Sequence, residues 1–486
     1  PIMSRLHLFL LAAVVFSFGF AQGAPGSSKK PNLMIILADD MGYGDMEHTG
    51  TTRLKTPHLN DLVAEGVFCS QGYVASPVCS PSRAGLITGR DPRRFGYQGN
   101  LNMGPEGYAT RPELLGLPPA EHTLGDQLKA AGYATGLIGK WHLGKGSGFH
   151  PNERGFDDFC GMLGGGHHYF PTRIENASIE RNGEPVTRYS SEYLTDFFTD
   201  EGIRWMEKHH ESGKPWFLFM SYNAPHTPMH ATPEDLELFK HIKNEKRRTY
   251  AAMMYALDRG VGRLRGWLKD HGEDRNTLII FLSDNGGAPD NGSWNGPLSA
   301  TKGTLKEGGV RVPMIWNWVG TLPAGGEYDA PASALDILPT FLAAAGAEAL
   351  PLSPPMSHED KRNRKRSVAR YGAYDGVNLL PSLKGDKEAP RRTLFWRLQG
   401  QSAVLDGADK LIRPPHRPAQ FFRPAEDPGE LRDLAPERGE RFEALFRMLG
   451  EWESSLSTVP LWGSSPYWDG ESSRLYEQRK VTDEPE

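Results

Sequence analysis

A cysteine and an arginine lie four residues apart in the stretch 79–90, which reads CSPSRAGLITGR. Pro81 marks a helix start, because proline is tolerated in the first turn, and Gly89 marks the end of that helix. The free N–H groups at a helix start favour an anion, here beside Cys79, and Arg83 follows one turn later on the same face. The stretch therefore predicts a nucleophile and a cation at an anion-binding helix end. The alternative is a buried cysteine that opens an ordinary helix.

Four apolar runs of strand length are each followed by a loop that carries polar side chains. Such runs are typical of strands buried on both faces of a parallel sheet, and ligands bind at the carboxyl ends of those strands. We therefore expect these loops to line one crevice. Cys79, at its helix start, and Lys302, from a glycine-rich loop, should line it as well. The runs are Asn32–Ala38, Tyr133–Ile138, Trp216–Tyr222 and Leu278–Leu282, and their loops carry Asp39 and Asp40, Lys140 and His142, His226, and Asp284 and Asn285 respectively.

The residue types in this crevice suit the transfer of a sulfuryl or phosphoryl group. Asp and Asn side chains offer hard oxygen ligands that suit Ca²⁺ or Mg²⁺ rather than Zn²⁺. A cation with three basic side chains would hold a small tetrahedral anion, and histidines move protons near neutral pH. The predicted metal ligands are Asp39, Asp40, Asp284 and Asn285, the basic side chains are Arg83, Lys140 and Lys302, and the histidines are His142 and His226.

The pattern C-x-P-S-R-x-x-x-apolar-T-G-R at Cys79 resembles the signature of the formylglycine-dependent sulfatases, arylsulfatase-like members of the alkaline-phosphatase superfamily. The resemblance extends from about residue 31 to 435. It implies that a formylglycine-generating enzyme oxidises Cys79 to formylglycine (3-oxoalanine). The hydrate of this aldehyde is then the nucleophile, and modified Cys79 is a further ligand of the metal, usually Ca²⁺.

The resemblance also implies a role for each basic residue of the site. Arg83 corresponds to the residue that holds the hydrate, and Lys140 and Lys302 to the lysines that bind sulfate. One hydroxyl of the hydrate attacks sulfur, and the alcohol leaves with a proton from His226 or with help from Lys302. The second hydroxyl then loses its proton to His142, and sulfate is expelled as the aldehyde re-forms.

We expect an α/β fold in which a large, mixed, mostly parallel sheet is sandwiched by helices, with a smaller C-terminal subdomain of antiparallel sheet and helix. The predicted divisions are a signal peptide (1–23), a catalytic domain (31–348), a linker or insert (349–391), a C-terminal subdomain (392–460) and a loosely ordered tail (461–486). Helices are predicted over 124–131, 336–345 and 438–456, and strands over 310–316, 394–398, 402–405, 410–413 and 420–423. The last helix should turn Phe442, Leu445, Phe446, Leu449 and Trp452 inward.

The segment Met3–Gly23 has the pattern of a secretory signal peptide: Arg5 and His7 precede the apolar run Leu8–Phe20, which is short for a membrane anchor. We therefore expect an exported protein, periplasmic or secreted. A net charge of −5 gives no indication of nucleic acid as a partner.

Three cysteines do not make a disulfide framework. If Cys79 is modified, Cys69 and Cys160 could pair, although two buried thiols are at least as well supported. The insert Leu350–Tyr371, with its basic run Lys361–Arg366, is interpreted as a solvated loop; the alternative is a basic rim that attracts a sulfated polymer.

Exported sulfatases that this chain resembles often act on sulfated carbohydrates, so the predicted substrate is a sulfated oligo- or polysaccharide. Candidate substrate-binding residues are His167 and His168 in the loop 164–170, with Arg93 and Trp294 near site motifs in sequence. Two alternatives stay open: a phosphomonoester or phosphonate-ester hydrolase on the same fold, and a catalytically inactive glycan-binding homologue. The sequence leaves open which sugar is recognised and the oligomeric state.

Overall fold

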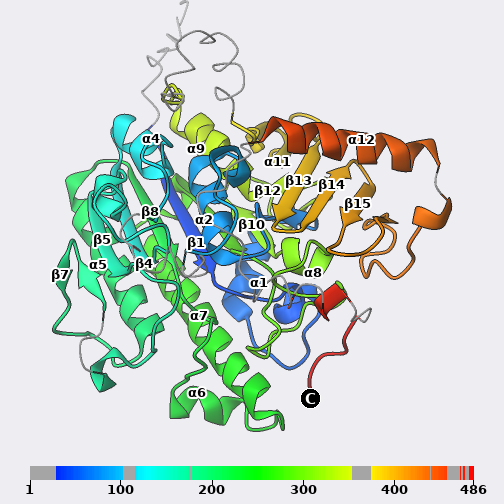
Figure 1. Cartoon of the computed structure of the whole chain (residues 1–486). Coiled ribbons are helices and arrows are strands. Elements are labelled where there is room, and N and C mark those ends of the chain that lie inside the picture. Colours follow the sequence, from blue (N-terminus) through cyan, green and yellow to red (C-terminus); the bar gives the residue numbers. More distant parts are fainter. Residues whose placement is uncertain are drawn as a thin grey trace, which may run out of the picture.

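A ten-stranded mixed sheet forms the centre of the molecule (Figure 1). The computed structural model describes residues 29–101, 115–174, 178–352, 374–437, 439–456, 471, 474–476 and 481–486. The predicted signal peptide and basic run 361–366 lie outside these residues, as does most of the insert 350–371. Five parallel strands make up the middle of the sheet, in the order β9 (Thr277–Ser283), β1 (Asn32–Ala38), β8 (Trp216–Ser221), β4 (Ala134–Lys140) and β5 (Asp158–Met162).

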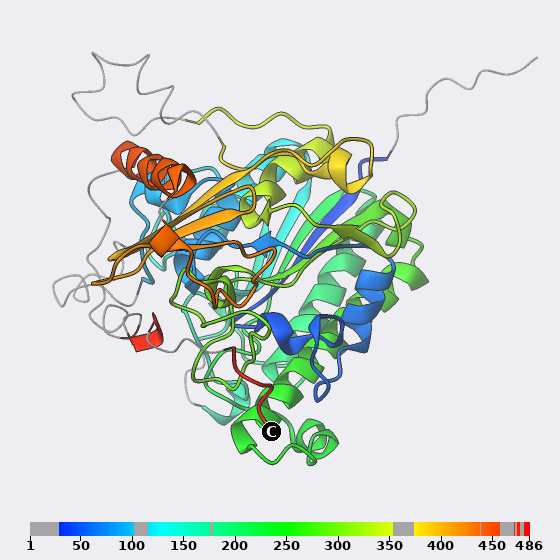
Figure 2. The same ribbon diagram turned by 90° about the vertical axis from the view of Figure 1, so that its right-hand side faces the viewer.

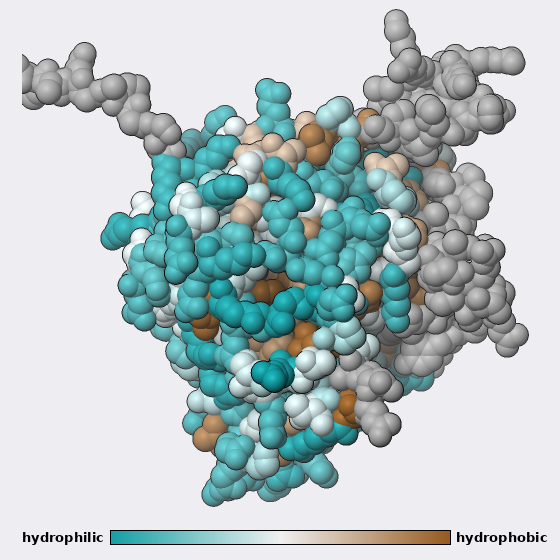
Figure 3. Space-filling model, turned by 90° about the vertical axis from the view of Figure 1, so that its left-hand side faces the viewer, coloured by the Kyte–Doolittle hydropathy of each residue, from teal (hydrophilic) through white to brown (hydrophobic). Residues whose placement is uncertain are grey.

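Shorter strands extend the sheet at both ends. Beyond β9 lie β10 (Met314–Asn317), which runs antiparallel to it, β2 (Val67–Cys69) and β11 (Gly326–Tyr328). Beyond β5 lie β6 (Glu180–Arg181) and β7 (Glu184–Pro185), both antiparallel to their neighbours. Figure 3 shows the side of the molecule on which β7 lies: hydrophilic side chains dominate it, around a hollow with an apolar floor. A separate parallel pair is formed by β3 (Gly72–Tyr73) and β12 (Ala332–Ser333).

Helices cover both faces of the large sheet, because alternate side chains of its buried strands enter two cores. Leu33, Ile35 and Leu37 of β1 face one core, whereas Met34 and Ile36 face the other. The first core is covered by α2 (Cys79–Thr88), α4 (Leu124–Ala130) and α9 (Ile337–Ala345), and the second by α1 (Pro57–Ala64), α5 (Leu194–Ser212) and α7 (Glu245–Asp270), with α6 (Pro233–Leu238) packed on α7. Two short helices, α8 (Glu307–Val310) and α11 (Leu380–Leu383), complete this part.

A four-stranded antiparallel sheet lies beside the main body, with α12 (Glu440–Ser455) on its outer face (Figure 2). Its strands are β13 (Thr393–Leu398), β14 (Gln401–Asp406), β15 (Asp409–Arg413) and β16 (Gln420–Phe422). Trp396 and Ile412 on one face join the first core of the main body, while Val404 and Leu411 on the other pack against α12. The small sheet therefore has no free face, and it is held to the catalytic part by apolar packing.

The predicted fold class is confirmed, and three local expectations need correction. The strand predicted over 310–316 begins only at Met314, because Glu307–Val310 form the short helix α8. Phe446 does not face inward: it is 46% exposed, whereas Leu445 beside it is buried. The described parts of the tail are docked rather than loose, since Tyr476 is buried and the Glu484 carboxylate pairs with Arg247 at 2.9 Å.

All three cysteines are buried free thiols, so the alternative of a Cys69–Cys160 disulfide is not realised. Within the residues that the structure describes, no helix combines the length and apolar character that crossing a membrane requires.

Candidate active site

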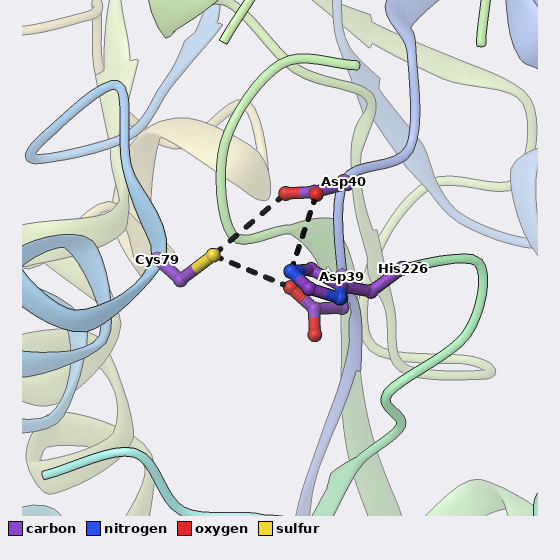
Figure 4. A group of neighbouring side chains, drawn as sticks. All are labelled: Asp39, Asp40, Cys79 and His226. Atoms are coloured by element: carbon purple, nitrogen blue, oxygen red, sulfur yellow. Dashed lines mark hydrogen bonds and ion pairs between the residues drawn. The ribbon is translucent and has the colours of Figure 1, made fainter. Parts of the chain in front are cut away.

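The first carboxylates of the site come from the end of β1 and face the cysteine that opens α2 (Figure 4). The Sγ atom of Cys79 lies 3.6 Å from Asp39 Oδ1 and 3.7 Å from Asp40 Oδ1. Adjacent side chains of a strand point to opposite faces, so a bend is needed for both to reach one site. Asp40 itself supplies the bend: its φ of 67° is left-handed, a conformation that aspartate adopts more readily than most residues.

Asp284 and Asn285 join the site because β9 is the direct parallel neighbour of β1, with Ser283 opposite Ala38. Asp284 Oδ1 accepts a hydrogen bond from the backbone N–H of Asp40 at 3.2 Å. The amide of Asn285 donates to Asp40 Oδ1 at 2.7 Å. All of the predicted metal ligands are therefore brought together from segments more than 240 residues apart.

Three buried cations balance the three carboxylates. Lys140 Nζ lies 2.6 Å from Asp39 Oδ2, and Arg83 Nε lies 2.9 Å from Asp284 Oδ2. Lys302 Nζ contacts Asp40 at 2.6 and 2.7 Å and Cys79 Sγ at 3.1 Å. Burial opposes ionisation of Cys79, but Lys140 and Lys302 outweigh it and lower the pKa of the thiol below its ordinary value. The predicted nucleophile thus lies in a positive field.

The two predicted histidines have opposite electrostatic surroundings. Burial, Lys140 and Arg83 hold the pKa of His142 well below its ordinary value, so this ring is neutral at pH 7. Burial also disfavours the charged form of His226, but Asp39 and Asp40 outweigh it and raise its pKa to about 9. His226 Nδ1 lies 2.5 Å from the carbonyl oxygen of Thr227, which directs Nε2 toward Asp40 at 3.6 Å. The pair is thus divided into a neutral base and a charged acid.

The donor set fits a hard divalent cation. The ligand atoms of Asp39, Asp40, Cys79 and His226 lie within 4.8 Å of one another. The Oδ1 atom of Asn285 is buried and has no hydrogen-bond partner among the described residues, although its amide nitrogen is well bonded. A buried amide oxygen beside two carboxylates suits Ca²⁺ or Mg²⁺, which prefer oxygen ligands.

The candidate substrate-binding residues lie in different surroundings. The loop of His167 and His168 approaches the site, since a Cβ added at Gly165 would lie 2.7 Å from the His142 ring. His168 lies against His230, with ring centroids 4.0 Å apart and the ring planes tilted by 41°.

Trp294 and Arg93 are held by other parts of the chain. The Trp294 indole N–H donates to the carbonyl of Thr482 at 2.7 Å. Arg93 is buried, pairs with Asp91 at 2.6 Å and donates to the Phe395 carbonyl at 2.8 Å. These bonds hold Arg93 between the main body and the small sheet, and its contact with substrate stays a prediction.

Sequence reasoning missed three polar residues that hold the site together. Ser221 accepts a hydrogen bond from Arg83 at 2.7 Å and donates to the Lys140 carbonyl at 2.6 Å. Tyr169 donates to the carbonyls of Asn223 and His226, and Asn291 donates to the carbonyl of Asp40. Ser221 had a usable signal, because it lies next to the last residue of the strand predicted over 216–222, whereas Tyr169 and Asn291 lie in loops whose course the sequence does not reveal.

Residues 31–347 match the family model Sulfatase. The chain belongs to the sulfatase family. It is accordingly an enzyme that hydrolyses sulfate esters, as the resemblance at Cys79 predicted. The chain is 33% identical over 421 residues to the N-acetylgalactosamine-6-sulfatase of Canis lupus familiaris. The aligned region covers 84% of this chain and 74% of the relative. It is 29% identical to the arylsulfatase A of Bos taurus, with 91% of each chain covered.

Solved structures share the fold. The crystal structure of Ps i-CgsB in complex with k-i-k-neocarrahexaose is 35% identical, with a TM-score of 0.79 and coverage of 92% of this chain and 98% of the other. The phosphonate monoester hydrolase of Agrobacterium radiobacter, at 19% identity and a TM-score of 0.58 over 87% of this chain and 95% of the other, shares the fold alone.

Proposed function

We propose that this sulfatase removes sulfate from a sulfated oligo- or polysaccharide through a hydrated formylglycine at Cys79 and a bound divalent metal, Ca²⁺ or Mg²⁺. One observation carries the proposal: Cys79 opens a helix in direct contact with Asp39, Asp40 and Lys302, so nucleophile, metal ligands and anion-binding cation share one buried centre. Because the Cys79 side chain is only 1% exposed, its chemistry is confined to this centre.

The metal would be held by Asp39, Asp40, Asp284 and Asn285, with modified Cys79 as a further ligand. When bound, it supplies positive charge that polarises the nucleophile and the sulfate oxygens. The Sγ atom of Cys79 stands where an oxygen of the formylglycine hydrate would lie, 3.1 Å from Lys302 Nζ. A formylglycine-generating enzyme is therefore a required partner for maturation.

The other residues of the chain bind the sulfate and move protons. Lys140 and Lys302 offer ammonium groups to the sulfate oxygens, and Arg83 orients the nucleophile from the same face of α2. His226 carries the proton for the leaving alcohol oxygen on Nε2, since Nδ1 is engaged with the Thr227 carbonyl. Both ring nitrogens of His142 are buried and have no partner among the described residues, so this ring is free to accept a proton.

A carbohydrate substrate is supported by the relatives and by the loop beside the site. One similar enzyme is named for N-acetylgalactosamine 6-sulfate, and one similar structure holds a neocarrahexaose. Residues 164–170 carry His167 and His168, and this loop reaches His142 at Gly165, so a sugar bound at the site would lie near it. The pattern of Met3–Gly23 supports export to the periplasm or the medium as a further part of this proposal.

The test is release of free sulfate from a panel of sulfated mono-, oligo- and polysaccharides by protein co-produced with a formylglycine-generating enzyme. Release from one compound, absent in Cys79→Ala, is the expected result and identifies the sugar. Cys79→Ser should stall as a sulfated enzyme, because serine lacks the second hydroxyl of the hydrate; full turnover by it would contradict the mechanism.

Two other outcomes would identify the rival functions. Faster cleavage of the phosphate ester than of the sulfate ester of one alcohol would favour a phosphohydrolase. Tight binding without turnover, by protein from its native host in which mass spectrometry finds Cys79 unmodified, would indicate a glycan-binding homologue.

A further inference from the structure

The tip of the β13–β14 hairpin of the small sheet reaches the two segments that carry Cys79 and Lys302. Leu398, at the end of β13, packs against Val78, the residue directly before Cys79. Gln401, at the start of β14, donates from Nε2 to the carbonyl of Gly303 at 2.7 Å, directly after Lys302. The hairpin tip thus contacts the immediate neighbours of both the predicted nucleophile and the cation beside it.

The Gln401 side chain is fixed from its other end as well. Its Oε1 accepts hydrogen bonds from the Tyr476 hydroxyl at 2.7 Å and from the Leu305 backbone N–H at 3.2 Å. The same N–H of Leu305 also donates to the Tyr476 hydroxyl at 3.0 Å. Gln401 and Tyr476 are 2% and 3% exposed, so these bonds form in surroundings where a lost partner is costly.

A buried ionic cluster holds the far end of the same loop. The Glu430 carboxylate accepts from the Glu307 backbone N–H at 2.8 Å and from the Ser299 hydroxyl at 3.3 Å. Lys410, from β15, lies 2.6 Å from Glu307 and 3.0 Å from Glu430. Both ends of the segment 299–307 are therefore bonded to residues from beyond position 400.

The catalytic part restrains this loop as well, for example by a hydrogen bond from the Asn295 amide to the Ala300 carbonyl at 3.2 Å. Residues 299–306 form neither helix nor strand. The Lys302 N–H donates to the Gly287 carbonyl at 3.0 Å, and the Gly303 N–H donates to the Pro77 carbonyl at 2.9 Å. The second bond connects the loop to the segment before Cys79, so a shift of Gly303 would be passed to both sides of the site.

We propose that Gln401 is a positioning residue of the sulfatase reaction: with Tyr476, it fixes the backbone on either side of Thr304, directly after Gly303, so that the Lys302 ammonium group stays against Cys79 and the sulfate. The small C-terminal sheet is then part of the catalytic apparatus rather than an appendage. This inference takes the role of Lys302 in binding sulfate from the proposed function. The position of Lys302 beside Cys79 comes from the structure alone. A displacement of about 1 Å at a reacting group costs up to about a hundredfold in rate.

The test compares Gln401→Leu and Tyr476→Phe with Gln127→Leu. Gln127 is the matched control: it is equally buried, donates to the Tyr374 hydroxyl at 2.7 Å and accepts from the Leu350 N–H at 2.7 Å, but on α4. Each variant is measured for thermal stability, for kcat and KM in sulfate release, and for affinity for inorganic sulfate by calorimetry in a Cys79→Ala background. The affinity for inorganic sulfate depends on the position of Lys302 and is measured without turnover.

We expect the two Gln→Leu variants to lose similar thermal stability, while only Gln401→Leu lowers kcat, by about tenfold, and weakens sulfate binding by about threefold. Tyr476→Phe should also lower kcat and weaken sulfate binding, but by smaller factors than Gln401→Leu. In a Lys302→Ala background the Gln401→Leu change should weaken sulfate binding less than about 1.5-fold, because the two residues act as one unit.

Equal effects of Gln401→Leu and Gln127→Leu on kcat and sulfate affinity would overturn the proposal, as would full additivity with Lys302→Ala. Absence of turnover by wild-type protein that contains formylglycine would instead contradict the proposed function. The inference about Gln401 would then still be decided by the sulfate affinities.

Discussion

Asp45 connects the loop after Asp40 to the helical layer, and its removal should destabilise the protein measurably. One carboxylate oxygen lies 2.6 Å from the guanidinium of Arg247. The other accepts from the Tyr250 hydroxyl at 2.6 Å and from the backbone N–H groups of Trp294 and Gly42 at 2.9 and 3.2 Å. Burial raises the pKa of Asp45 in spite of Arg247, so the ion pair adds little net stability, and the partners left unsatisfied determine the loss.

The expected cost of Asp45→Ala follows from those partners. Arg247 keeps its second ion pair, to Glu484 at 2.9 Å, and the Gly42 N–H keeps the Tyr250 oxygen as an acceptor at 3.3 Å. The Trp294 N–H, the Tyr250 hydroxyl and one guanidinium N–H become unsatisfied. At about 1–3 kcal/mol for each unsatisfied buried group, the free energy of unfolding should fall by about 4 kcal/mol. An unfolding entropy of about 2.1 cal/mol/K per residue converts this to a fall in Tm of about 4 °C for a chain of this length.

Differential scanning calorimetry at one scan rate, with and without Ca²⁺, would measure the effect. Asp61→Ala is the control, since Asp61 is 61% exposed and its ion pair with Arg265 spans 3.8 Å; its Tm should change by less than about 0.5 °C. Ca²⁺ should raise the Tm of Asp45→Ala less than that of wild type, because Gly42 follows Asp40, a proposed metal ligand, by two residues. A decrease in the Tm of Asp45→Ala of less than about 1 °C would refute the argument that unsatisfied hydrogen-bond partners determine the loss of stability.

Two further substitutions probe the site and the helical layer. Gly165→Ala should lower kcat by about tenfold with little change in Tm, because its Cβ would lie 2.7 Å from the His142 ring; Gly164→Ala, whose nearest neighbour is Lys145 Nζ at 3.7 Å, should leave kcat unchanged. Asp258 accepts from the N–H groups of His58 and Leu59 at the start of α1, and burial raises its pKa to about 7. A carboxyl group whose pKa is raised by folding contributes stability that is lost as the pH rises toward 7 and above. The Tm of wild type should therefore exceed that of Asp258→Asn by more at pH 5 than at pH 8. A Tm difference that grows with pH would contradict the raised pKa of Asp258.

The central strands and the helix of Cys79 were predictable because their signals are local. Asn32–Ala38 is apolar on both faces and was assigned to a buried strand with the bounds that the structure shows. The helix that opens at Cys79 ends at Thr88, and Gly89, which was predicted to end it, has a left-handed conformation. The polar loops after these strands gathered as expected, since parallel strands bring their carboxyl ends to one edge.

The errors arose where tertiary contacts override a local pattern. Val310 reads as the start of a strand, but Gly308 and Gly309 allow the chain to fold into α8 against the backbone of residues 299–304, where a Cβ would clash. Phe446 has the right spacing for the inner face of α12, yet its ring lies under the Arg413 guanidinium and stacks on Phe442, with ring centroids 6.2 Å apart. The network of Gln401 has no sequence signal, because its partners are separated by about a hundred residues.

The place of β1 in the sheet has a consequence for biosynthesis. This strand is the earliest of the large sheet in the chain, yet both of its hydrogen-bonding neighbours, β8 and β9, begin only at Trp216 and Thr277. At a translation rate of roughly 5–20 residues per second, the backbone N–H and C=O groups of this strand of apolar side chains stay unpaired for about 10–35 s before β8 has emerged. During that interval β1 is an exposed template for wrong strand pairing, so the nascent chain should depend on a holding chaperone far more than the finished enzyme does.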